Sequence, residues 1–248
     1  MNIWEIDDIQ YFLALLPVVA LLYAAVGHGG ASGYLAIMAL WSFPVSVMKP
    51  TALILNLFVA AVSFIAFARK GHFNWRLFLA FALTSVPLAF LGGMIELNEP
   101  VYRRVLALLL VFAILRMLGL IGKDNLEITA VPLRQALAIG AVIGFFSGMI
   151  GIGGGIILSP VILLMRWGTM RQAAAVSAAF IWVNSASGLL GHISRGISIE
   201  PQAFILIGVA LIGGLFGGYL GSIKFNNLIL KRVLAFVLII ACAKLFLT

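Results

Sequence analysis

The stretch GMIGIGGGIILSP, residues 148–160, interrupts a long apolar run with five glycines. Glycine has no Cβ atom, adopts positive φ readily and weakens a helix interior. A helix broken at bilayer depth leaves backbone N–H and C=O groups unpaired, which is tolerated only where the break is buried in protein or lines a cavity. The stretch therefore predicts a broken membrane helix and marks a candidate binding site.

The rest of the chain has the composition of an integral membrane protein. Of its 248 residues, 63% are hydrophobic and 10% are charged, and the mean hydropathy is +1.17. So few polar side chains could not cover the surface of a soluble protein of this length. The apolar segments exceed about 18 residues and are separated by short charged turns, which predicts an all-α polytopic membrane protein rather than a barrel.

The formal net charge of +8 comes from Lys and Arg residues scattered through the short loops. Anionic lipid headgroups and the positive-inside rule account for this pattern, so we exclude nucleic acid as a partner. Cys242 is the single cysteine. It excludes both a disulfide and a cysteine-ligated metal cluster within one chain.

Two halves of the chain resemble each other. RRVLALLLVFAILRML at 103–118 matches KRVLAFVLIIACAKLF at 231–246, and GHGGASG at 27–33 aligns with GIGGGII at 151–157. Such internal similarity predicts two homologous repeats. The division is an N-terminal segment at 1–9, repeat 1 at 10–122, a linker at 123–131 and repeat 2 at 132–248.

Each repeat is predicted to hold a glycine-broken segment of about thirty residues and three ordinary membrane spans. The spans are expected near 50–68, 76–96, 103–121, 173–191, 201–222 and 231–247. If every segment crossed the membrane once, Lys and Arg would divide evenly between the two sides. If both broken segments re-enter, most of them fall on one side, which predicts an inverted-topology repeat with both termini outside. Two short crossings in each broken segment would place the loops on the same sides of the membrane, and this alternative is left open.

The glycines of GIGGG favour an anion as the ligand. They let it approach backbone N–H groups closely, and the segment from Ile156 onward presents a positive helix N-terminus. The alternative is that the glycines only allow close helix packing. The backbone candidates for substrate binding are Gly29 and Gly30 with Ser32 in the first half, and Gly153, Gly154 and Gly155 in the second.

The acidic residues all fall at segment ends or in loops. No carboxylate is then available at mid-membrane, so we expect no metal site and disfavour a cation carrier. The polar candidates within spans are Asn56, Asn184 and Ser185. Their alternative role is a hydrogen bond between helices.

Three residues are candidates for proton transfer or gating. His28 lies inside the first break. Lys49 and Arg171 are placed at matching positions by the alignment of VMKPTA with TMRQAA, where they could guide anions. Interfacial snorkelling is the alternative for both cations.

With GIGGGIILSP, the duplicated break, GHFNWRLF and VNSASGLLGH, the chain resembles the TauE/SafE sulfite exporter family, also called TSUP, over nearly its whole length. The most specific element is GxGGGxxxxP, and the first-half copy departs from it at Ala31 and Ala36. The resemblance implies a cytoplasmic-membrane permease for small sulfur-containing anions such as sulfite, thiosulfate, sulfoacetate or other organosulfonates. The matched positions are Gly151, Gly153, Gly154, Gly155 and Pro160.

The predicted function is export of such an anion by alternating access, with the anion held at the broken-helix N-termini. A monoanion that leaves an interior-negative cell gains about 2.3 kcal/mol per 100 mV, so no coupling ion is required. An anion channel is one alternative. An intramembrane hydrolase using Ser32 and His28 is another, but we expect no enzyme activity and no cofactor. The expected partners are the anion and the bilayer. Whether the chain forms a homodimer is left open.

Overall fold

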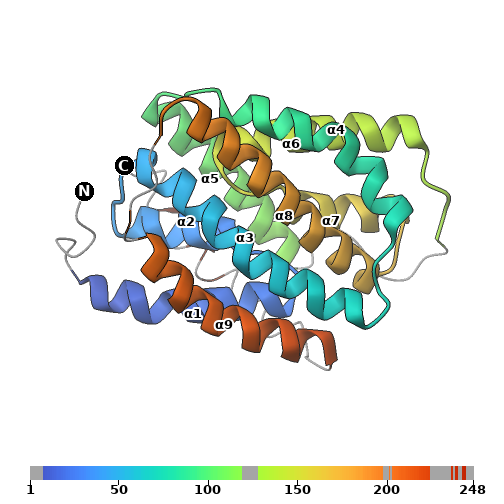
Figure 1. The fold of residues 1–248 in the computed structure, drawn as a ribbon, viewed down its shortest axis with the longest axis horizontal. Coiled ribbons are helices and arrows are strands. Elements are labelled where there is room, and N and C mark those ends of the chain that lie inside the picture. The colour runs from blue at the N-terminus through green and yellow to red at the C-terminus, as the bar shows by residue number, and fades with distance from the viewer. Residues whose placement is uncertain are drawn as a thin grey trace.

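The computed structural model describes residues 8–118, 128–197, 201 and 203–223, with 236, 238, 239, 242 and 243 near the C-terminus. All regular structure in these ranges is helical, which confirms the predicted class (Figure 1). The helices are α1 (Ile9–Ala25), α2 (Ala31–Leu40), α3 (Val45–Arg69), α4 (Trp75–Gly93), α5 (Glu99–Met117), α6 (Leu133–Ile150), α7 (Gly155–Leu164), α8 (Met170–Ser194) and α9 (Ala203–Ile223).

Five of these helices, α3, α4, α6, α8 and α9, are long and apolar enough to span a membrane. They include four of the predicted spans, although α3 begins at Val45 and α8 at Met170, ahead of the predicted limits. The span predicted near 103–121 corresponds to α5, whose arginines exclude it from these candidates. The span predicted near 231–247 lies largely outside the described residues.

The predicted breaks lie between α1 and α2 and between α6 and α7. Helices α2 and α7 have only 10 residues each, too few to cross a bilayer. The breaks contain the glycines with positive φ that the sequence led us to expect. These are Gly27 and Gly30 in the first break (residues 27–30) and Gly151, Gly153 and Gly154 in the second break (residues 151–154).

Each broken segment turns back toward the end at which it began. At the start of α1, Trp41 Nε1 donates to Asp8 O at 3.2 Å, and the Trp41 ring packs on Phe12. The end of α2 therefore lies beside the start of α1. Likewise, Thr129 N donates to Arg166 O at 2.8 Å, which places the end of α7 beside the residues that precede α6. Both segments are helical hairpins.

Glycines at four-residue spacing bring long helices into close contact, as Figure 1 shows for α4 with α6 and α1 with α9. A Cβ atom on these glycines would strike the backbone of the facing helix. This is the small-residue packing typical of membrane bundles. The glycines are Gly140, Gly144 and Gly148 of α6, facing Phe81, Ser85 and Ala89, and Gly213, Gly217 and Gly221 of α9, facing Pro17, Leu21 and Ala25.

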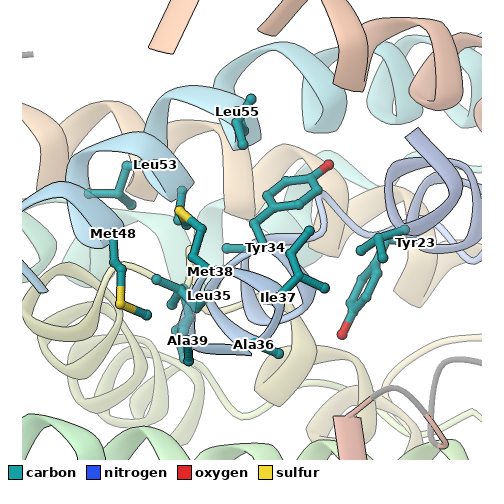
Figure 2. Packing of buried hydrophobic residues seen from close by; sticks show 14 of the residues in the cluster. Tyr23, Tyr34, Leu35, Ala36, Ile37, Met38, Ala39, Met48, Leu53 and Leu55 are labelled. Atoms are coloured by element: carbon teal, nitrogen blue, oxygen red, sulfur yellow. The ribbon is translucent and has the colours of Figure 1, made fainter. Parts of the chain in front are cut away.

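The short helix α2 is enclosed by protein on all sides. Only Leu40 at its end is not buried. Figure 2 shows Tyr34, Leu35 and Met38 of α2 among Leu53 and Leu55 of α3. An apolar half-helix without a polar face is expected in such a core. The backbone of the first break thus adjoins a helix enclosed by protein, as a break at bilayer depth would require.

Candidate functional site

The two breaks converge on the same two side chains, Asn56 of α3 and Ile181 of α8. A Cβ atom at Gly29 would lie 2.6 Å from Asn56 Oδ1 and 2.8 Å from Ile181 Cγ2. A Cβ atom at Gly153 would lie 2.7 Å from Asn56 Nδ2 and 2.8 Å from Ile181 Cγ2. The structure therefore brings Gly29, Gly153 and Asn56 together from both halves of the chain. We call these three residues with Ile181 and Ser185 the central site.

The helices that begin at the two breaks have no side-chain caps. Gly30 precedes α2 and Gly154 precedes α7, both in the left-handed conformation. The first N–H groups of any helix lack intrahelical acceptors and are usually satisfied by a cap, water or ligand. In contrast, α8 carries a capping box in which Thr169 Oγ1 accepts from Gln172 N. Two buried helix N-termini whose first N–H donors have no side-chain cap thus meet near Asn56.

Asn56 and Ser185 form a hydrogen bond between α3 and α8. Asn56 Nδ2 donates to Ser185 Oγ at 3.2 Å, both side chains are fully buried, and Asn56 Oδ1 has no partner. Rotation of the amide by 180° exchanges its oxygen and nitrogen. Ser185 would then donate to Oδ1, and Nδ2 would present a donor on the Gly29 side. Asn56 can therefore offer a hydrogen bond to an anion at the break.

Asn184, the second candidate amide, joins α8 to α4. Its Oδ1 accepts from Ser85 Oγ at 2.6 Å, and its Nδ2 donates to Phe180 O at 2.9 Å. These bonds match its alternative role as a link between helices.

Ser32 and His28 make different contacts. Ser32 Oγ lies 2.8 Å from Tyr23 Oη, whereas His28 Nε2 lies 3.0 Å from Ser159 Oγ. Ser159 in turn donates to Ser177 Oγ at 2.9 Å. His28 of the first break therefore bonds to α7 and, through it, to α8. The hydrolase alternative requires His28 beside Ser32, and it gains no support from these bonds.

The remaining break glycines pack against side chains. Tyr34 covers Gly30 and donates from its hydroxyl to Gly29 O at 2.8 Å. A Cβ atom at Gly154 would lie 2.8 Å from Ile143 Cγ2, and one at Gly155 would run into Ile181. Gly30, Gly154 and Gly155 thus shape the backbone around the central site.

Lys49 and Arg171 do not occupy matching places. A Cβ atom at Gly151 would lie 3.2 Å from Lys49 Cα, and one at Gly27 would lie 2.5 Å from Ala174 Cβ. The reciprocal contacts match Lys49 with Ala174, each the fifth residue of its helix, so the predicted pairing with Arg171 was wrong by three positions. Lys49 is buried, whereas Arg171 is exposed at the start of α8.

Arg171 belongs to the basic end of the molecule. Burial, and then the positive charges of Arg171 and Lys70, lower the pKa of His72 in the loop between α3 and α4. Two further cations, Arg69 and Arg76, flank that loop.

Over the ranges that the structure describes, no group of three or more His, Cys, Asp or Glu residues could hold a metal ion.

Several residues around the breaks were not predicted from the sequence. Ile181 carries no chemical signal of its own, so only the fold reveals its place opposite Asn56. Ser159 lies within the GGGIILSP stretch, which could have drawn attention to it. Tyr23 and Tyr34 flank the first break, and their hydroxyls mark them as polar groups in an apolar run.

Comparison with known proteins identifies the relatives of this chain. The family described as Sulfite exporter TauE/SafE matches residues 12–245. A "Probable membrane transporter protein y4hK" of Sinorhizobium fredii is 42% identical over 233 residues, covering 92% of this chain and 94% of the relative. A "Probable membrane transporter protein MJ0441" of Methanocaldococcus jannaschii is 24% identical over 221 residues, covering 81% and 82%. No solved structure matches.

Proposed function

Because the chain belongs to the Sulfite exporter TauE/SafE family of membrane transporters, we propose that it exports a small sulfur-containing anion across the cytoplasmic membrane. The candidate substrates are sulfite, thiosulfate, sulfoacetate and other organosulfonates. Membership of the family indicates a membrane transporter. The chemistry of the central site supports a negatively charged substrate.

The observation that carries this proposal is the meeting of two uncapped helix N-termini at Asn56. Each N-terminus presents N–H groups and the equivalent of about half a positive charge. Such ends are ready-made anion sites, and two of them in a dry interior reinforce each other. Glycine at positions 29 and 153 lets the backbone of both breaks lie against Asn56, and the amide of Asn56 adds a directional donor.

The buried polar residues of the described ranges also favour an anion. They are hydroxyls, two amides, one lysine and one histidine, with no carboxylate among them. A cation carrier needs a negative or carbonyl-rich site, whereas the donors here suit an oxyanion. The membrane potential favours outward movement of a monoanion by about 2.3 kcal/mol per 100 mV.

Alternating access by two inverted repeats is the proposed mechanism. The two hairpins, the packing of α4 on α6 and α9 on α1, and the contacts Gly27–Ala174 and Gly151–Lys49 are arranged in pairs. Such pairs are expected of repeats related by a two-fold axis in the membrane plane. Rocking of one repeat against the other would open the central site to either side in turn. With the basic end inside, both termini lie outside.

A thermal-shift panel on purified protein tests the proposal. The ions are sulfite, sulfate, thiosulfate, sulfoacetate, taurine, acetate and chloride, with Gly153→Ala as the site variant and Gly71→Ala as its control. Gly71 has a φ of 75°, close to the 70° of Gly153, but nothing lies within 4 Å of its Cβ position. At 100 times Kd a ligand stabilises by about 2.7 kcal/mol.

We expect one sulfur anion to raise Tm in the wild type and in Gly71→Ala but not in Gly153→Ala. No selective stabilisation in a folded wild-type protein would contradict the proposal. Counterflow in proteoliposomes separates a carrier from a channel, because only a carrier exchanges labelled substrate against unlabelled substrate on the opposite side.

A further inference from the structure

The C-terminal end of α6 is surrounded by polar side chains from three other helices. His192 of α8 donates from Nε2 to Gly148 O at 3.1 Å, and Tyr102 of α5 donates to Ile150 O at 3.2 Å. The Nζ atom of Lys49 lies 4.5 Å from the centroid of the Tyr102 ring. We call Lys49, Tyr102 and His192 the α6-end cluster. All three side chains are buried, with exposed fractions of 6%, 0% and 1%.

The positive charge of Lys49 lacks a negative partner in the described ranges. The ion pairs found there are Arg103–Glu99 and Arg195–Glu96, and neither includes Lys49. Coulombic interactions link Lys49 to Arg195 and Glu96, but those two charges already neutralise each other. The Tyr102 ring and the α6 C-terminus attract a cation without cancelling its charge. A buried ammonium in this position is costly unless an anion accompanies it.

His192 supplies a second incomplete group. Its Nε2 carries the hydrogen that Gly148 O accepts, and its Nδ1 is buried without a partner. Gly148 O, which His192 contacts, and Ile150 O, which Tyr102 contacts, lie two residues apart in α6, so the ring and Lys49 adjoin the same helix end. A buried polar atom that no protein group satisfies usually belongs with a water or a ligand. In the neutral ring Nδ1 is an acceptor, which can take a hydrogen bond from the hydroxyl of a protonated oxyanion such as hydrogensulfite.

The opposite end of the molecule shows that packing does not require these charges. There, the residue that matches Lys49 is Ala174, which contacts Gly27 as Lys49 contacts Gly151. Ala174 belongs to a small apolar cluster with Ala175 and Phe67. Apolar side chains therefore satisfy the same helix crossing at that end. Packing therefore does not explain why a lysine and a histidine lie beside α6.

We infer that the α6-end cluster binds a small oxyanion, with Lys49 as the charged ligand and His192 as the second. The site is separate from the central site but close to it. Gly151 lies against Lys49 and Gly153 against Asn56, and two residues span at most about 7 Å. The oxyanion is either a free sulfur oxyanion or the phosphate of an anionic lipid. If this site is the outermost anion-binding position on the transport path, that role rests on the proposed function. Binding of an oxyanion at the cluster does not.

The stoichiometry of sulfite binding tests this inference. Protein in phosphatidylcholine nanodiscs is titrated with ³⁵S-sulfite in a scintillation proximity assay. We expect two ions per wild-type chain and one in Lys49→Met, with affinity at the lost site reduced at least ten-fold. Lys70→Met removes the same charge from an exposed loop and is expected to keep both ions. A Lys49→Met variant that keeps every bound ion would overturn the inference.

Gly153→Ala separates the two proposals. We expect this variant to lose the central ion and keep the one that depends on Lys49. If the proposed function fails, the wild type binds a single sulfite, Gly153→Ala keeps it, and Lys49→Met still loses it. Should Lys49→Met not fold, Lys49→Arg is expected to keep binding and His192→Gln to weaken it. Equal binding in those two variants would count against the cluster.

A lipid source is distinguished in nanodiscs that contain phosphatidylglycerol. If a headgroup occupies the cluster, phosphatidylglycerol competes with the ³⁵S-sulfite that depends on Lys49, and native mass spectrometry finds it retained by the wild type but not by Lys49→Met. A carboxylate of this chain is the competing occupant of the α6-end cluster. Glu5, Asp7 and Glu200 are acids that lie outside the described residues. If sulfite binds beside Lys49 only in Glu5→Gln, Asp7→Asn or Glu200→Gln and not in the wild type, the inference is overturned.

Discussion

The first break combines two left-handed glycines, Gly27 and Gly30, with side-chain hydrogen bonds, whereas the second has three left-handed glycines. In the first, Tyr34 donates to Gly29 O and His28 contacts Ser159. In the second, Gly151, Gly153 and Gly154 all have positive φ. Because L-residues with a Cβ atom rarely adopt this conformation, the second break depends on the absence of side chains. The first break depends on the same conformation at Gly27 and Gly30 and, in addition, on the hydrogen bonds of Tyr34 and His28.

This difference accounts for the unequal sequence motifs. The full GxGGG pattern is needed where the backbone itself must turn, and Gly155 must lack a Cβ because Ile181 occupies that space. The first break has Ala31 at the matching place and histidine where the second has Ile152. The two breaks therefore present similar helix ends to the central site through different means, and substitutions should affect them unequally.

The largest effect is expected from Gly153→Ala. The added Cβ would lie 2.7 Å from Asn56 Nδ2 and 2.9 Å from Ser185 Oγ, and the residue would also be strained at positive φ. We expect sulfur-anion transport into proteoliposomes to fall at least 100-fold. The control Gly71→Ala carries only the backbone strain, about 1 kcal/mol of stability, and should transport normally. Equal loss in both variants would mean that strain alone, and no central site, explains the effect.

The next effect is expected from Asn56→Leu, which keeps the branched shape of the side chain and removes the donor. A hydrogen bond to a charged group contributes about 1.5 to 3 kcal/mol, so substrate affinity should fall roughly 10- to 100-fold. Asn184→Leu is the matched control. It breaks the bonds between α8 and α4 and should lower Tm while leaving affinity in the folded protein near that of the wild type. If Asn184→Leu weakens binding more than Asn56→Leu, the two amides have been assigned the wrong roles.

A packing glycine should behave differently from a break glycine. Gly144→Val places side-chain atoms against the Ser85 backbone of α4 and should cost about 1 to 3 kcal/mol of stability. Anion affinity, measured on the fraction that folds, should change less than three-fold. Chemical denaturation in detergent gives the first quantity and equilibrium binding the second. A large loss of affinity with unchanged stability would refute the separation of the two glycine classes.

The smallest effect is expected from Tyr34→Phe in the first break. The change removes the hydroxyl that bonds to Gly29 O and should cost about 1 kcal/mol. Transport should fall only a few-fold, because the backbone of α2 is still enclosed by protein. An effect as large as that of Gly153→Ala would show that the first break is the more sensitive of the two.

Much of the fold could be predicted from local sequence features. Apolar runs located the long helices, and clustered glycines located both breaks, because both signals act over a few residues. The register of α3 against α8 could not be predicted in this way. Sequence similarity suggested that Lys49 and Arg171 are equivalent positions of the two halves. The helix starts at Val45 and Met170 exclude this equivalence.

The central site was predictable only in part. Gly29, Gly153 and Asn56 carry visible signals, because glycines and an amide stand out in an apolar chain. Ile181 does not stand out, and its place comes from the packing of α8 against both breaks. The bond between His28 and Ser159 joins residues 131 positions apart, a distance at which local patterns give no information.

A crystal structure with thiosulfate, located by the anomalous scattering of its sulfur atoms, tests the central claim most directly. If the two breaks jointly hold the anion, a peak will lie beside Asn56, with its oxygens about 2.7 to 3.2 Å from first-turn N–H groups of both α2 and α7. Thiosulfate bound only beside Lys49, or in contact with only one of the two helix ends, would contradict it.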